Sequence, residues 1–454
     1  MNQTTMNPTT MNQQMLPPTD LAPTKPVTAE LAPTGLTRRR FLRNSGIAVA
    51  AAGSASLLHT QLASAQGGAT AAAAGTGNTL LVIFCRGGMD GLSLVAPVAT
   101  PEYYSLRPSI AVPQQAALAL GGTHADSRFA LHPAAVRLSG MYNQGSVAIV
   151  NSAGVMTSSR SHFDAQSFLE GGAGNTNMSP TGWAGRWMSS TVGASDHPLR
   201  CVAIGGGLPA SLRGGSAVAA SGFGSLSLLP WGPSVETVTT STTDLYNRAG
   251  VHPALTPWAA PTLGTIAQVS SLTSTDRPAS FPDTEISRNL WPIARLLQAG
   301  FPIEIAHAEM HDWDTHDAMG SATATTARMY TQVSELDTAI GAFFDYLGAA
   351  ASKVTIAVVS EFGRRAYENS SGGCDHGRAF PMMVIGGGVA GGTYGDFQGL
   401  SSAGLDQGDV RVTTDYRTVL SELLSRRLGA SSSVLNTTFP QFSATNSWLG
   451  VAAA

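Results

Sequence analysis

Histidine, aspartate, glutamate and serine residues gather in four short clusters, and each cluster directly follows a short apolar run. The clusters are Arg86-Gly87-Gly88-Met89-Asp90 after residues 80–84, Arg160-Ser161-His162-Phe163-Asp164 after 147–150, His311-Asp312-Trp313-Asp314-Thr315-His316 after 303–305, and Glu361-Phe362-Gly363-Arg364, with Asp375-His376 beyond it, after 354–359. In an open parallel sheet, groups just past the carboxyl ends of the strands converge on one crevice. Imidazoles and carboxylates bind zinc and harder divalent cations. We therefore predict a single metal site assembled from distant segments.

Asp314 and His316 form the most informative pair. Extended backbone places two such residues on one face, which suits a chelating pair. His311 and Asp312 offer a second pair, and exposed loop residues are the alternative for both. Only 12% of the residues in this chain are charged, so the density of imidazole and carboxylate here favours a functional role.

Three further positions could supply metal ligands. Glu361 ends an apolar strand, where a buried carboxylate is costly unless it is paired or metal-bound; pairing with Arg364 is the structural alternative. Asp90 follows a glycine-containing turn that would project its carboxylate into the crevice, although an Asp-Gly turn needs no function. Asp375 and His376, in a glycine-rich loop, form another candidate ligand pair.

Ser161 precedes a helical pattern that stops at Gly171-Gly172. It is either a helix cap or a nucleophile, and the two roles are compatible. Arg160 and His162 flank it and could hold an anionic substrate or move a proton. His132 opens another helical pattern, where it either packs on the sheet or contributes to substrate binding.

Helical and strand patterns alternate along the chain. Strands are expected at 80–84, 147–150, 201–204, 303–305, 354–359 and 382–385, and helices from 132 and at 161–170, 286–298, 325–347 and 416–427. This alternation predicts an α/β fold, a mostly parallel sheet with helices on both faces. Residues 174–280 carry weaker signals, and we interpret them as a lid or insertion over the site.

The N-terminal region indicates export. Residues 1–35 have the composition of a disordered segment. Arg38 and Arg39 then precede a weakly apolar run at 46–58 and the small-residue sequence Ala63-Ser64-Ala65. We predict a twin-arginine (Tat) signal at 36–65, with a chance basic cluster as the alternative.

Cleavage after Ala65 would leave a flexible lead-in at 66–78 and one α/β domain at 79–454. The apolar run is about half the length that a bilayer span requires, so we expect no stable membrane insertion after cleavage. The predicted location is the periplasm or the exterior, with the Tat translocase as a partner during export.

Charge and cysteine content exclude several classes. The formal net charge is −3, and nothing basic is clustered enough to suggest nucleic acid or an anionic membrane. Cys85, Cys201 and Cys374 are too few for a disulfide framework. They could form one bridge and one buried thiol, or all three could be small buried residues.

The motifs themselves resemble a known family. They are the runs from Phe84 to Ser93, Arg160 to Gln166, Trp313 to His316 and Ser360 to Arg364, then Asp375-His376-Gly377 and Gly386-Gly387-Gly388. In order and spacing they are similar to the Tat-exported family catalogued as domain of unknown function 1501 (DUF1501). That family resembles, more distantly, the alkaline phosphatase and sulfatase superfamily.

The resemblance implies specific roles. Asp90 would be the first-strand metal ligand, Ser161 the nucleophile, and Asp314, His316, Glu361, Asp375 and His376 the later ligands. The cofactor would be one or two divalent ions of zinc, calcium, magnesium or manganese. The sequence departs from the superfamily where an adjacent Asp-His is common, because Glu361-Phe362 stands there instead. The sulfatase signature Cys-x-Pro-x-Arg is also absent, which argues against a formylglycine enzyme.

Two functions follow. The first is an exported metal-dependent hydrolase of small or polymer-borne phosphate or sulfate esters, in which Ser161 attacks and arginines clamp the anion. The candidate clamps are Arg86, Arg160 and Arg364. The alternative is a non-catalytic exported binding or scaffold protein on a hydrolase-like fold, because fold does not fix function.

Overall fold

The computed structural model describes residues 77–174, 179–191, 197–226, 235–246, 256–272, 276–443 and 448–453. The predicted N-terminal extension and export signal, and nearly all of the lead-in, lie outside these ranges. Within them, the first strand begins at Thr79, where the α/β domain was expected to start.

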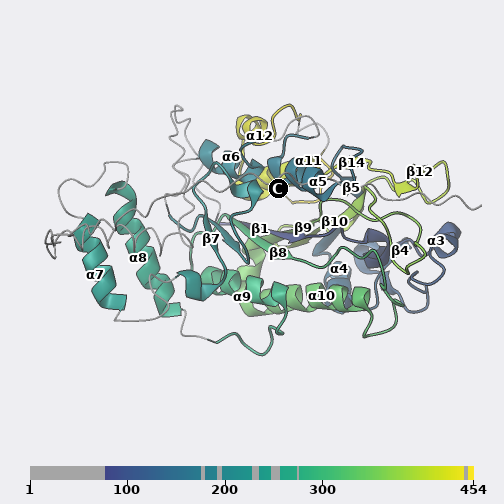
Figure 1. Cartoon of the computed structure of the whole chain (residues 1–454), viewed down its shortest axis with the longest axis horizontal. Coiled ribbons are helices and arrows are strands. Elements are labelled where there is room, and N and C mark those ends of the chain that lie inside the picture. Colours follow the sequence, from purple (N-terminus) through teal and green to yellow (C-terminus); the bar gives the residue numbers. More distant parts are fainter. Residues whose placement is uncertain are drawn as a thin grey trace, which may run out of the picture. The chain divides into compact units, whose positions relative to one another are not determined.

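A large, mostly parallel sheet forms the centre of the α/β domain (Figure 1). Its strands are β1 (Thr79–Cys85), β5 (Val147–Gly154), β6 (Cys201–Ile204), β7 (Val218–Ala220), β8 (Ile305–Met310), β9 (Val354–Val359), β10 (Phe380–Gly386), β11 (Gly392–Tyr394) and β14 (Thr414–Asp415). The order is β11-β5-β10-β9-β1-β8-β6-β7, with β14 also beside β5. In the described residues only β10 runs antiparallel to its sheet neighbours, β5 and β9. The predicted α/β fold class is confirmed.

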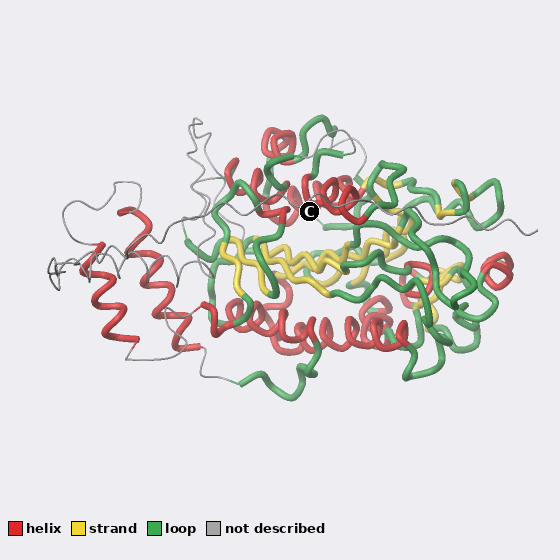
Figure 2. The backbone as a smooth tube through the Cα atoms, viewed as in Figure 1, coloured by secondary structure: helices red, strands yellow, loops and turns green. Residues whose placement is uncertain are grey.

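Helices cover both faces of this sheet (Figures 1 and 2). On one face lie α4 (Val136–Asn143), α9 (Glu285–Gln298) and α10 (Arg328–Leu347); on the other lie α5 (His162–Gly171), α6 (Trp183–Ser190), α11 (Tyr416–Leu428) and α12 (Ser432–Thr438). The strands β1, β5 and β9 are buried along their whole length. Short, continuously apolar runs are what a sheet covered on both faces requires, which explains why these strands were predictable.

Smaller elements complete the described part of the chain. They are α2 (Gly91–Leu94), β2 (Val95–Ala96), α3 (Pro101–Leu106), β3 (Leu118–Leu120), η1 (Gly122–His124), β4 (Asp126–Leu131), η2 (Ala210–Leu212), η3 (Phe223–Leu226), α7 (Val235–Tyr246), α8 (Thr256–Leu272), η4 (Gly348–Lys353), β12 (Leu405–Asp406) and β13 (Asp409–Val410). Strands β2, β4 and β3 form a small sheet, and β12 pairs with β13.

Two sequence predictions need correction. The strand expected at 303–305 is instead Ile305–Met310, because His307 and Glu309 interrupt the apolar pattern although they lie within the strand. The segment 174–280 is not wholly a lid, since β6 pairs with β8 and β7 pairs with β6, both in parallel. That part of the segment therefore widens the central sheet.

The structure also bears on disulfide formation and on membrane-spanning helices. Cys85, Cys201 and Cys374 are buried free thiols, so they act as small core residues and form no bridge. No helix within the described ranges is long and apolar enough to cross a membrane.

Candidate metal centre

Four of the predicted chemistry-bearing side chains meet at the carboxyl edge of the sheet. Asp314 and His316 follow β8, His162 opens α5 after β5, and His376 lies in the connection from β9 to β10. These segments are distant in sequence, yet each follows a strand that points toward the same edge. The geometry agrees with the general rule for open α/β sheets.

The Asp314 carboxylate is the centre of this group. Its Oδ1 lies 3.1 Å from Nε2 of His316 and 3.3 Å from Nε2 of His376. Its Oδ2 lies 3.6 Å from Nε2 of His162. The Nε2 atoms of His316 and His376 are only 2.9 Å apart. The ligand atoms of His162, Asp314 and His376 all lie within 4.8 Å of one another, so these three residues could hold a metal ion.

Each histidine is oriented through its other ring nitrogen. Nδ1 of His162 lies 2.9 Å from Oε1 of Glu361, and Nδ1 of His316 lies 3.2 Å from Oδ1 of Asp375. Nδ1 of His376 donates to the Arg160 carbonyl at 2.8 Å. Because a carbonyl or ionised carboxylate only accepts, each Nδ1 carries a proton, and Nε2 is the ring atom that faces Asp314 in each histidine.

The electrostatics of the group favour ionised carboxylates. Burial would raise the pKa of Glu361, but hydrogen bonds from His162, Gln166 and the Gly87 backbone lower that pKa to about 2. Burial likewise opposes ionisation of Asp314, yet its pKa is lowered overall by Arg364 and the nearby histidines. Burial lowers the pKa of His376, which keeps its Nε2 lone pair available.

Arg364 ties together the loops that carry these ligands. It is fully buried, and it donates from Nε to the Gly88 carbonyl at 2.7 Å and from Nη1 to the Cys374 carbonyl at 3.0 Å. Its Nη2 donates to Asp314 Oδ1 and to the carbonyls of Gly87 and Trp313.

Gly87 permits the close approach of these loops. Its φ is +117°, and a Cβ at this position would lie 2.5 Å from the Asp314 backbone nitrogen. A side chain at position 87 would therefore push the Asp314 loop away, because a Cβ requires more space than this contact leaves.

Two arginines predicted to bind an anion instead pair with groups of the protein itself. Arg86 pairs with Glu170 at 2.7 Å through Nη1 and with Glu309 through Nη2. The guanidinium group of Arg364 donates its hydrogen bonds to backbone carbonyls and to Asp314. These residues hold the fold together, and the prediction of substrate contacts does not fit their surroundings.

Asp90 lies outside the ligand group. Its fully buried carboxylate accepts from Arg107 Nη1 at 2.6 Å and from Ser93 Oγ at 2.7 Å. The predicted role as first metal ligand is therefore replaced by a buried ion pair. No sequence pattern distinguished Arg107 as the partner.

Glu361 and Asp375 orient histidines, whereas the sequence predicted that they bind metal directly. His162, which the sequence suggested could hold an anionic substrate or move a proton, is a candidate ligand. The pair His311 and Asp312 does not join the group, since Nδ1 of His311 lies 2.6 Å from Oε1 of Glu285. Ser161 caps α5, with its Oγ accepting from the Asp164 backbone at 3.5 Å, so the capping role is confirmed.

His132 is a core residue. Its side chain is fully buried, Nδ1 accepts from the Ala134 backbone N–H at 3.2 Å, and its ring meets that of Tyr330 edge-on with centroids 5.6 Å apart. The packing alternative thus holds and the substrate-binding one does not.

We expect His132 to make stability acid-sensitive. Burial lowers its pKa from 6.5 to about 4. The unfolded chain takes up this proton as pH falls below about 6.5, whereas the folded protein does so only near 4, so stability is lost across that window by up to roughly 3 kcal/mol. Urea unfolding of metal-free protein between these pH values should show a shallower pH dependence for His132→Asn. Identical slopes for the two proteins would contradict this assignment.

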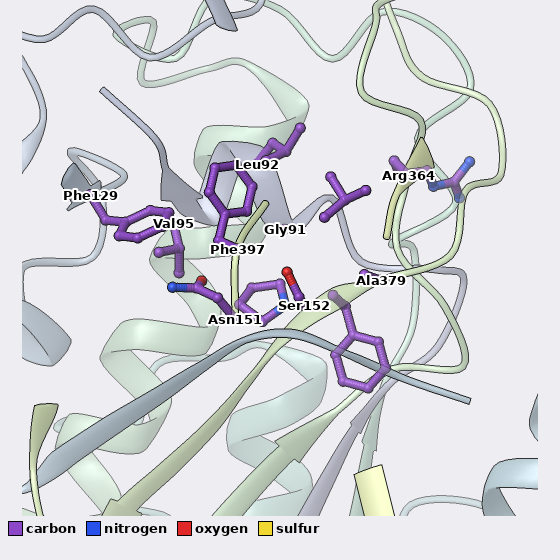
Figure 3. A pocket seen from close by; sticks show the side chains of 12 residues that line it. Gly91, Leu92, Val95, Phe129, Asn151, Ser152, Arg364, Ala379 and Phe397 are labelled. Atoms are coloured by element: carbon purple, nitrogen blue, oxygen red, sulfur yellow. The ribbon is translucent and has the colours of Figure 1, made fainter. Parts of the chain in front are cut away.

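A small cavity adjoins Arg364 (Figure 3). Its volume is about 20 Å³, which suffices for roughly one water molecule. Figure 3 shows Asn151 and Ser152 near the apolar side chains of Phe129 and Phe397, with Arg364 on the other side. The Ser152 hydroxyl is buried and has no partner within the described residues. This cavity fits a buried water and is too small for a substrate.

Comparisons with known proteins agree with the motifs. Residues 273–425 match the model of the family described as protein of unknown function (DUF1501), which confirms the resemblance seen in the sequence. No curated protein matches this chain.

Similar solved structures include alkaline phosphatase from the Antarctic bacterium TAB5, with 10% identity over 71% of this chain and 95% of that chain and a TM-score of 0.28. The lipoteichoic acid synthase LtaP from Listeria monocytogenes has 9% identity over 74% of each chain and a TM-score of 0.32. The PsFucS1 sulfatase from Pseudoalteromonas sp. has 14% identity over 70% of this chain and 64% of that chain, with a TM-score of 0.30.

Proposed function

We propose that this protein is an exported, metal-dependent hydrolase of phosphate or sulfate esters. The observation that carries the proposal is the convergence of three Nε2 atoms on the Asp314 carboxylate. Two bare imidazole nitrogens 2.9 Å apart repel each other unless a proton or a cation lies between them. The rings are fixed for metal binding by acceptors at Nδ1, as metal-ligating histidines usually are.

The donor set fits a transition-metal ion. His162, Asp314 and His376 would hold it, with His316 as a further ligand. Imidazole-rich sites favour zinc, whereas calcium and magnesium prefer oxygen ligands. Such an ion, when bound, neutralises the developing charge on a phosphoryl or sulfuryl group and lowers the pKa of the attacking group.

The chain's own residues supply the remaining roles. Ser161 stands at the N-terminus of α5, where the backbone N–H groups and the helix dipole favour a negative charge. It is our candidate nucleophile, and a water molecule is the alternative attacker. Glu361 and Asp375 orient His162 and His316, respectively, through the Nδ1 atoms of those rings.

Ser161→Ala separates these two attackers. We expect ester hydrolysis to be abolished if Ser161 attacks, with metal content unchanged and a loss of about 1 kcal/mol in stability from the lost cap. Ser431 provides a matched control, because it caps α12 in the same way, through the Val434 backbone. Ser431→Ala should cost similar stability and no activity. Hydrolysis that survives Ser161→Ala would leave water as the attacker.

A scaffold function has one observation in its favour. Asp90, Arg86 and Arg364 all pair with internal partners, so fewer of the residues expected to bind metal or substrate are available for it. We would adopt this alternative if metal-loaded wild-type protein were inert on a broad panel of phosphate and sulfate esters.

Export is the second part of the proposal. Replacing Arg38 and Arg39 with Lys should retain the precursor in the cytoplasm of a host with a Tat system, because the translocase reads the arginine pair. Arg43→Lys, outside the pair, is the control and should be exported normally. Fractionation and immunoblotting measure the result, and an unchanged periplasmic yield of the double variant would remove the Tat assignment.

A further inference from the structure

Two arginines beside the candidate metal centre retain unused donors. Arg160 directs Nε to Oδ2 of Asp409 at 2.8 Å and also places Nη2 there, which leaves Nη1 without a partner in the described part of the chain. Arg365 donates from Nη1 to the Gln407 carbonyl at 2.9 Å, which leaves Nε and Nη2. Their side chains are 28% and 22% exposed, respectively. Arg364, by contrast, is fully buried, and all three of its guanidinium nitrogens donate hydrogen bonds to protein groups.

Asp409 lies near both arginines. Its carboxylate is buried; Oδ2 accepts hydrogen bonds from Arg160, and Oδ1 forms a longer ion pair with Arg365, 3.8 Å from its Nη1. Arg378 is close enough to Asp409 to act on it electrostatically and pairs with Asp406. Three guanidinium groups thus share two carboxylates, and the surplus charge of the cluster is positive.

The backbone links this cluster to the metal centre. The Arg160 carbonyl accepts from Nδ1 of His376 at 2.8 Å, and the Arg365 N–H donates to the Asp375 carbonyl at 3.0 Å. The His376 ring therefore lies between the Arg160 backbone carbonyl on its Nδ1 side and Asp314 on its Nε2 side. The two arginines thus belong to segments that directly contact those of the candidate metal centre.

We propose that Arg160 and Arg365, beside Asp409, form an anion subsite for a second phosphate or sulfate group of the substrate. The inference rests on the proposed hydrolase function and narrows its substrate class to esters that carry two anionic groups. Guanidinium groups suit this task because their planar donors match oxyanions in pairs. The guanidinium carbon of Arg365 also lies 5.3 Å from the centroid of the Tyr367 ring, which limits the side chain's freedom.

The test measures binding of inorganic phosphate by calorimetry to the exported protein after removal of metal by chelation. We expect Arg365→Ala to weaken phosphate binding by about 10-fold, since charge-assisted hydrogen bonds are lost. Arg365→Lys, which keeps the charge without the planar fork, should bind with intermediate affinity. Arg128→Ala is the matched control, because the Arg128 side chain is 65% exposed and Asp126 is its ion-pair partner; this variant should bind phosphate as wild type does.

Activity provides a second measurement. Arg365→Ala should raise KM for esters with a second phosphate or sulfate and leave KM for single-charge esters unchanged, with kcat preserved in both. Phosphate binding equal to that of wild type in Arg365→Ala, or no phosphate binding by the wild type, would overturn the subsite. If phosphate binding depends on Arg365 but no ester is hydrolysed, the subsite stands and the hydrolase function fails.

Discussion

Replacing His376 with Ala should lower the affinity of the protein for zinc by about 100-fold or more. The side chain supplies one of three Nε2 atoms that face Asp314, and a methyl group supplies none. Loss of an orienting partner costs roughly 10- to 100-fold in other metal sites, so loss of a ligand should cost at least as much. Asp314→Asn should behave similarly because it removes the carboxylate that all three Nε2 atoms face.

Metal analysis of purified protein and zinc titration after chelation would measure this effect. His311→Ala is the matched control: His311 belongs to the same loop as Asp314 and His316, but it pairs with Glu285 and stands outside the ligand group. It should bind zinc as wild type does. If His311→Ala loses as much affinity as His376→Ala, the metal lies elsewhere; if wild-type protein binds no transition metal, the centre itself is rejected.

Variants of the orienting carboxylates should give smaller losses. Asp375→Asn retains an acceptor oxygen for Nδ1 of His316 but no charge, and Glu361→Gln does the same for His162. We expect roughly 10-fold weaker zinc binding in each. The assigned roles would be supported if the ligand variants lose more zinc affinity than the orienting variants. Equal losses of zinc affinity would mean that the carboxylates bind metal directly.

The sequence indicated the segments of this group because each follows a strand, and the strands before His162 and Glu361 are continuous apolar runs. A strand buried on both faces can be recognised in the sequence as a continuous apolar run. The residue after such a strand lies at the carboxyl edge of the sheet. This rule brought Asp314, His316 and His376 to one place in the fold. It could not separate a candidate ligand from a residue that orients one, since both are polar groups beyond a strand end, and in the structure Glu361 and Asp375 face the Nδ1 atoms of histidines.

Partners far apart in the chain left no sequence signal. The sequence predicted that Asp90 binds metal, but in the fold it pairs with Arg107. It also predicted that Arg86 binds an anionic substrate, but in the fold Arg86 pairs with Glu170 and Glu309. Strand β8 was misplaced for a related reason, because tertiary burial of His307 and Glu309 overrides the polarity that pattern reading depends on. Of the arginine cluster around Asp409, the sequence indicated only Arg160, because Arg365 and Asp409 come from separate segments that only the fold brings to it.

Arg364→Met should destabilise the protein by about 3–5 kcal/mol, the cost of removing one partner from a buried charged network. Methionine fills much of the same volume, yet it leaves the carbonyls of Gly87, Gly88, Trp313 and Cys374 without their donor. Asp314 would also lose its only fully buried cationic neighbour within the described residues. Urea unfolding of chelated protein at neutral pH measures this change without any contribution from bound metal.

Arg365→Ala provides the control for this effect, since Arg365 is the next residue in the chain but is partly exposed and makes few contacts. Its stability should stay within about 1 kcal/mol of wild type. Zinc affinity should fall in Arg364→Met as well, because the Gly87-Gly88 turn and the Asp314 loop are no longer held against each other. A stable Arg364→Met variant with normal zinc binding would mean that water satisfies these carbonyls and that the ligands are positioned without the arginine. Loss of both properties together would establish that one buried guanidinium couples the stability of the fold to the geometry of its metal centre.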